Sequence, residues 1–146
     1  MGMQRLTALM LLATLPLLAA DPFLGTWKLN TAQSKLTRPA PREMTVTWVA
    51  EGDSVKVVTR GANASGEPFQ SEYVARYDGK ETTRKGPWNW DVVINRQVSE
   101  HEREDVFKKG GKVEGHSRLV VSPDGKRLTV NFEYAGEHSM RVFDRQ

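Results

Sequence analysis

Apolar and polar residues alternate along most of the chain after residue 20. From Phe23 to Leu29, and again from Met44 to Ala50, every second position is apolar or glycine and the positions between are mostly polar. A period of two predicts strands that bury one face. The same pattern predicts further strands at Ser54–Arg60, Pro68–Tyr77, Trp90–Val98, His101–Lys108, Lys112–Ser122, Arg127–Tyr134 and His138–Arg145.

The segments between these strands are short and rich in turn formers. Asp78-Gly79, Gly110-Gly111 and Pro123-Asp124-Gly125 supply glycines for the positive φ angles of tight hairpins. Only Asn30–Arg42, with Pro39 and Pro41, is irregular, and we expect a loop there with at most one helical turn. Short, even spacing favours a meander. The sequence therefore predicts an all-β fold, an up-and-down antiparallel β-barrel of about 8–9 strands.

The first 20 residues have a different pattern. Arg5 gives a positively charged start, and an apolar run from Leu6 to Ala19 ends in small residues before Asp21. These are the features of a secretory signal peptide. We expect residues 1–20 to be a signal peptide and residues 21–146 to form one lipocalin-like β-barrel domain, exported to the periplasm or secreted. The run is shorter than a spanning helix needs, and no later stretch is comparably apolar, so we expect the mature protein not to span a membrane.

Composition excludes several classes of function. The chain has no cysteine, which rules out disulfides and cysteine-based metal sites or nucleophiles. The formal net charge is only +3, and acids and bases are interspersed, so no basic stripe suits nucleic acid. Neither a phosphate-binding glycine loop nor a Gly-x-Ser-x-Gly motif occurs, so no cofactor is expected and the sequence does not favour an enzyme.

The densest charge run is His101–Asp105. Neighbours in a strand point to opposite faces, so its acidic residues do not form a catalytic pair, and we expect an exposed edge strand protected by charge. The three histidines, His101, His116 and His138, lie on separate predicted strands without close pairing. We therefore expect no metal site.

Both ends of the mature chain resemble known families. Gly25-Thr26-Trp27 resembles the Gly-x-Trp of the first strand in lipocalins and fatty-acid-binding proteins, and Arg141-Val142-Phe143 resembles the Arg-x-Tyr of the last strand in fatty-acid-binding proteins. With Ser122–Val130, these ends are similar to lipocalin-like exported bacterial proteins of the calycin superfamily, most of which have no assigned ligand. Phe143 lacks the tyrosine hydroxyl, and no helical hairpin is expected after the first strand.

The resemblance implies a ligand site inside the barrel, lined by aromatic residues that alternate inward. In the resembled families the tryptophan of the first strand packs beneath an arginine of the last strand, so a structural role is expected for Trp27 before a binding one. Arg141 has two readings: inward, it pairs with a ligand carboxylate; in the other phase, Met140 and Val142 are inside and Arg141 is in solvent or over Trp27. The candidate ligand-binding residues are Trp27, Trp48, Tyr73, Trp90, Phe132, Tyr134, Arg141 and Phe143.

Three functions are compatible with this sequence. The first is an exported protein that binds a small hydrophobic or amphipathic ligand in the barrel. The second is a protein-interaction or inhibitor module with a filled barrel, and the third is an enzyme on a calycin scaffold. A wide apolar cavity favours the first, a packed interior the second, and an inward cluster of ionisable groups the third.

Overall fold

A computed structural model describes residues 20–84 and 88–146. The predicted signal peptide falls almost wholly on residues 1–19, outside the described residues, and it stays a prediction. The described part of the chain contains ten strands and no helix. The strands are β1 (Gly25–Leu29), β2 (Glu43–Glu51), β3 (Ser54–Ala62), β4 (Pro68–Ala75), β5 (Asp78–Thr83), β6 (Val92–Ser99), β7 (Glu102–Lys109), β8 (Lys112–Val121), β9 (Arg127–Tyr134) and β10 (Glu137–Arg145).

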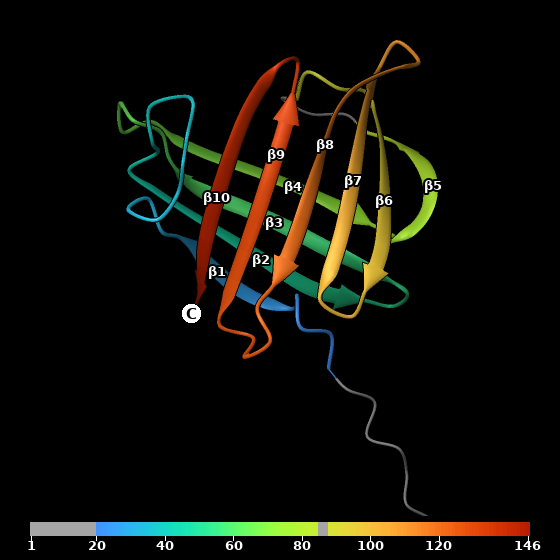
Figure 1. The fold of residues 1–146 in the computed structure, drawn as a ribbon, viewed down its shortest axis with the longest axis horizontal. Helices are drawn as coiled ribbons and strands as arrows, with labels where there is room; N and C mark the ends of the chain where they lie inside the picture. Colours follow the sequence, from blue (N-terminus) through green and yellow to red (C-terminus); the bar gives the residue numbers. More distant parts are fainter. Residues whose placement is uncertain (1–19, 85–87) are drawn as a thin grey trace, which may run out of the picture.

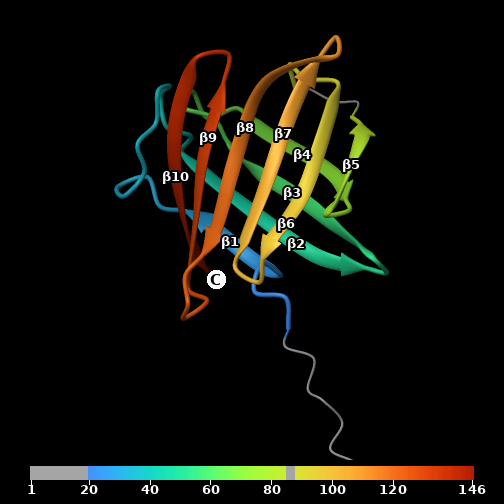
Figure 2. The ribbon, with the colours of Figure 1, turned by 45° about the vertical axis from the view of Figure 1, so that its right-hand side comes forward.

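All ten strands form one antiparallel sheet in the order β4-β3-β2-β1-β10-β9-β8-β7-β6-β5. Every ladder joins sequence neighbours except that of β1 with β10, which brings the two ends of the domain together. The sheet folds over so that β6–β10 cross in front of β1–β4, with β5 at one side (Figures 1 and 2). The result is an up-and-down half-barrel whose two layers enclose the interior.

The expectation of an all-β meander is confirmed. The described residues form ten strands instead of about 8–9, and a half-barrel in which β4 and β5 are not paired instead of a closed barrel. The missed strand is β5, where the sequence indicated only a turn at Asp78-Gly79. Its residues are polar throughout, and the β5–β6 register shifts between Asp78 and Glu81. A strand without apolar alternation is invisible to a search for hydrophobic periodicity.

The expectation of an edge strand at His101–Asp105 is wrong. β7 is an inner strand, paired on one side with β6 and on the other with β8. Arg103 and Asp105 point inward and are buried, with exposed fractions of 4% and 7%, whereas Glu102 and Glu104 take the outward positions. The charged side chains of this segment therefore alternate between the interior and the surface.

One end of the half-barrel is closed by a tightly packed core. Phe23 and Trp27 have no exposed surface, and Phe23 stacks on Trp48 with ring centroids 5.1 Å apart. The Trp27 indole N–H donates to the Phe23 carbonyl at 2.9 Å, and the Arg145 guanidinium lies 4.2 Å from the centre of the Trp27 ring. These contacts hold this end of the half-barrel closed.

Arg145 also closes the chain at this end. Its guanidinium donates to the carbonyls of Pro22, Leu24 and Gly125 at 2.6–2.7 Å. Gly25, at φ 120°, makes the approach possible, because a Cβ there would lie 2.6 Å from Nη1 of Arg145. The arginine over Trp27 is thus Arg145, and the alternative that placed Arg141 there is excluded by the structure.

Candidate functional site

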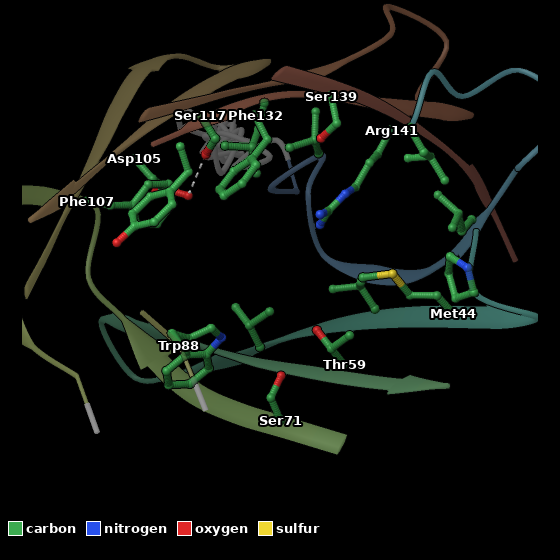
Figure 3. A pocket seen from close by; sticks show the side chains of 18 of the residues that line it. Met44, Thr59, Ser71, Trp88, Asp105, Phe107, Ser117, Phe132, Ser139 and Arg141 are labelled. Carbon is green, nitrogen blue, oxygen red and sulfur yellow. Dashed lines mark hydrogen bonds between the residues drawn. The ribbon is translucent and has the colours of Figure 1, made fainter. Parts of the chain in front are cut away.

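A cavity of about 560 Å³ lies between the two layers, next to the packed end. This volume is within the range of about 300–1,000 Å³ typical of small-molecule sites. Its wall follows the strand alternation: on β10, for example, Ser139, Arg141 and Phe143 face the cavity while the residues between them face outward. On the opposite layer, Thr59 of β3 and Ser71 of β4 point into the same space (Figure 3).

Seven of the eight candidate residues line this cavity. They come from strands far apart in sequence, and the alternation places them together because each strand contributes every second residue. The seven are Trp48, Tyr73, Trp90, Phe132, Tyr134, Arg141 and Phe143. The eighth, Trp27, is absent from the lining and lies in the packed core.

An aromatic cluster forms part of the cavity wall. Trp90 is its centre, with ring centroids 4.4 Å from Phe107 and 5.4 Å from Tyr134. Trp88 stacks on Trp90 and meets Tyr73 edge to face, at 6.1 and 5.9 Å. Phe107 and Trp88 were not among the sequence candidates, although Phe107 shares the inward phase of its strand. The cluster gives the cavity a large, rigid apolar surface.

The Asn30–Arg42 loop covers part of the same cavity. It contains a turn but no helix, as expected for most of its length, and Leu36, Pro39 and Pro41 line the cavity. The loop is held to β10 by a bridge between Lys35 and Met140. Arg38 of the loop donates two hydrogen bonds to the carboxylate of Glu137, at 3.1 and 3.0 Å.

Arg141 is one of the arginines of the cavity wall. It enters the cavity beside Ser139 (Figure 3), and its guanidinium lies 5.4 Å from the centre of the Phe132 ring. Within residues 20–84 and 88–146, no carboxylate lies within ion-pair distance of it. Burial lowers the pKa of this guanidinium. A partly buried cation without a counter-ion makes the binding of an anionic group at this position favourable.

The cavity wall also holds a buried polar cluster that the sequence interpretation missed. We call Arg84, Asn95, Asp105 and Ser117 the polar cluster. Arg84 donates to the Asn95 amide oxygen at 2.9 Å, and the Asn95 amide donates to Asp105 Oδ1 at 2.5 Å. The Ser117 hydroxyl lies 3.3 Å from Asp105 Oδ2, and Arg84 stacks over Tyr73 at 3.6 Å. All four members of the cluster are at least nine-tenths buried.

This cluster is an inward group of ionisable residues, the feature that would favour an enzyme. Its members are a carboxyl, a guanidinium, an amide and a hydroxyl, and no histidine of the described residues joins them. His116 and His138 lie instead on the outer face, each opposite Glu133 across the β8–β9 and β9–β10 ladders. Among residues 20–84 and 88–146, the base beside Ser117 is the Asp105 carboxyl, which is already bonded to Asn95. The described part of the cluster therefore lacks the arrangement of an activated nucleophile.

Burial raises the pKa of Asp105, and it raises the pKa of Tyr73 to about 12. Asp105 is faced by Tyr73 of β4, Arg84 after β5, Asn95 of β6, Arg103 of its own strand and Ser117 of β8. Hydrogen bonds from Asn95 and Ser117 and the charges of Arg84 and Arg103 act in the opposite direction to burial, which is the stronger effect.

A folded-state pKa above the unfolded one makes the sign of the pH effect definite. The contribution of Asp105 to stability is fully present below its unfolded pKa and is lost as the pH rises through its folded pKa. The Asp105→Asn side chain carries no charge at any pH. The free energy of unfolding of this variant, minus that of the wild type, should therefore increase as the pH rises from about 4. Urea denaturation of both proteins over a pH series measures this difference. A difference that shrinks with rising pH would show that Arg84 and Asn95 outweigh burial.

Solved structures share this fold. A fatty-acid-binding protein of Schistosoma mansoni in complex with arachidonic acid is 16% identical, with a TM-score of 0.61 over 86% of this chain and 97% of that one. The fluorescent protein UnaG is also 16% identical, at a TM-score of 0.62 over 86% and 98%. Fatty-acid-binding protein 1 of Echinococcus granulosus is 14% identical, at 0.60 over 86% and 98%.

No protein-family model matches the sequence, and no curated protein is significantly similar to it. At identities of 14–17% the structural likeness establishes the fold alone. The fold is thus the one seen in these fatty-acid-binding proteins. The described residues include no helix long and apolar enough to cross a membrane.

Proposed function

We propose that this protein binds a small amphipathic molecule with an acidic head group in the cavity between its two sheet layers. The observation that carries the proposal is Arg141, a partly buried cation without a carboxylate partner among the described residues, in a wall that is otherwise largely aromatic and aliphatic. The apolar part of the ligand packs against the Trp90 cluster, and the acid pairs with the guanidinium.

Two further observations support binding over the alternatives. A cavity of about 560 Å³ favours ligand binding over an interaction module with a filled barrel. The solved structures of the same fold include one described as a complex with arachidonic acid, a long-chain carboxylic acid. We also propose, from the pattern of residues 1–20, that the protein acts after export.

The test compares an acid with its neutral analogue. Dodecanoic acid and dodecanol are titrated against the wild type and Arg141→Met, with tryptophan fluorescence as the readout. A charge-assisted hydrogen bond contributes about 1.5–3 kcal/mol, so Arg141→Met should weaken the acid roughly tenfold or more and leave the alcohol unchanged. Arg127→Met, which removes an exposed arginine of β9, is the matched control and should change neither affinity.

Two outcomes would contradict the proposal. If neither ligand binds the wild type at high micromolar concentration, the cavity does not take acyl chains, and the interaction-module alternative becomes the better one. If Arg141→Met weakens the acid and the alcohol equally, Arg141 supports the wall and does not recognise the head group.

A further inference from the structure

We propose that the polar cluster is a second subsite of the cavity, and that it takes a hydroxyl group at the far end of the ligand from its acid. The ligand class would then be a hydroxylated acyl chain, with the acid at Arg141 and the hydroxyl at Asp105 and Arg84. This inference rests on the proposed function and makes it more specific.

The strand register places the two polar positions at opposite ends of the inner face. Across β6 to β10, one row of paired inward residues reads Asn95, Asp105, Ser117, Phe132 and Ser139. Arg141 is the next inward residue of β10 after Ser139. Three strand spacings separate β7 from β10, about 14 Å. Figure 3 shows Asp105 and Ser117 on one side of the cavity, Arg141 on the other, and Phe132 between them.

The charges of the two subsites differ. In the polar cluster, the Arg84 guanidinium and the Asp105 carboxyl are joined through the Asn95 amide, so this guanidinium already has an acidic side chain close by. An additional anion there would face the buried Asp105 carboxyl. Arg141 has no such neighbour among the described residues and attracts the anion. The head group therefore binds at Arg141, and the cluster suits a neutral group that both donates and accepts hydrogen bonds.

The cluster also has hydrogen-bonding capacity left over. Ser117 contacts Asp105 Oδ2 only at 3.3 Å, long for an O–H···O bond, so this oxygen can accept a better donor. The buried Nε of Arg84 has no acceptor within residues 20–84 and 88–146. Both side chains line the cavity. A hydroxyl can donate to Oδ2 and accept from a guanidinium N–H, and so satisfy both groups at once.

The primary experiment uses the unaltered protein. Isothermal titration calorimetry compares dodecanoic acid with ω-hydroxydodecanoic acid. If the cluster receives the hydroxyl, the hydroxy acid should bind about tenfold tighter. In a wall with no polar subsite the hydroxyl would lose its water without a new partner and would weaken binding instead. The direction of the difference decides between the two.

The ω-methoxy acid adds a second comparison on the same protein. It keeps an acceptor oxygen but cannot donate to Asp105, so it should lose the advantage of the hydroxy acid. A methoxy acid that binds as tightly as the hydroxy acid would overturn the assignment of Asp105 as the acceptor.

Variants then locate the hydroxyl. Arg84→Met/Asp105→Leu removes both charges together, which avoids leaving one buried charge unpaired. It should bind the acid and the hydroxy acid without preference for the latter. Thr59→Val, which removes a cavity hydroxyl on the opposite layer, is the matched control and should keep the preference. A preference that disappears in Thr59→Val and survives in the double variant would place the hydroxyl elsewhere.

Failure of this inference is distinct from failure of the proposed function. If dodecanoic acid binds and the hydroxy acid binds equally or more weakly, the second subsite is wrong and the anion site stands. If neither binds, the proposed function itself fails. Thermal unfolding of each variant establishes that it is folded, and the wild-type comparison decides the matter should the double variant not fold.

Discussion

Trp27→Ala should lower the free energy of unfolding by about 3–5 kcal/mol, the usual cost of truncating a buried aromatic residue. Trp27 has no exposed surface, and the variant would also lose the indole hydrogen bond to the Phe23 carbonyl and the face on which Arg145 lies. Since small domains are stable by only about 5–15 kcal/mol, this is a large share of the total. Urea denaturation followed by circular dichroism measures it.

A conservative variant separates packing from the hydrogen bond. Trp27→Phe keeps an aromatic face beneath Arg145 and loses the indole N–H, so it should fall between the wild type and Trp27→Ala. Ligand binding provides the opposing readout, because Trp27 is absent from the cavity lining. A Trp27→Ala protein with unchanged stability and weakened dodecanoic acid binding would show that Trp27 serves the ligand and not the scaffold.

The fold was largely predictable because most strands bury one face. β2, β3, β8 and β10 contain the apolar alternation that the period-two rule detects, and their bounds agree with the expected ones to within a few residues. β5 lacked that signal, since the sequence Asp78–Thr83 contains no apolar side chain. The strand exists because its backbone pairs with β6. Backbone pairing does not require apolar side chains, so the residue types do not reveal it.

The orientation of β10 shows why the phase of a strand can be ambiguous. Val142 and Phe143 are both buried, although they face opposite sides of the sheet. Phe143 packs in the core, whereas the backbone of Val142 is bonded to Asn30 and Ser34 of the Asn30–Arg42 loop. Apolar residues thus occur in both phases of this strand. The choice between Arg141 inside and Arg141 outside therefore required the structure.

The aromatic part of the site was visible in the sequence and the polar part was not. Aromatic residues on alternating positions indicate an inner face whatever their partners are. Asp105 and Asn95 become interior residues only because β6, β7 and β8 place them beside Ser117 and Arg84, which are distant in sequence. A buried polar network is a property of the pairing between strands.

Asp21 and Arg103 form the other contact that the sequence did not reveal. Arg103 Nη2 lies 2.6 Å from the Asp21 carboxylate, and the Arg103 side chain is only 5% exposed. Its guanidinium lies 4.2 Å from the centre of the Phe23 ring and 4.0 Å from that of Tyr77. Phe23 is part of the same closed end as Trp27. The pair thus joins the segment before β1 to β7.

Asp21→Asn should lower the free energy of unfolding by about 3–5 kcal/mol, because removing one partner leaves the other charge buried and uncompensated. Replacing both partners, in Asp21→Asn/Arg103→Met, should recover part of this loss, since a methionine among Phe23, Trp48 and Tyr77 needs no counter-ion. Urea denaturation of the wild type, both single variants and the double variant forms a thermodynamic cycle. Single effects that simply add in the double variant would show that the two side chains are not coupled. A coupled cycle would establish that Arg103 is held in the core by the carboxylate of Asp21.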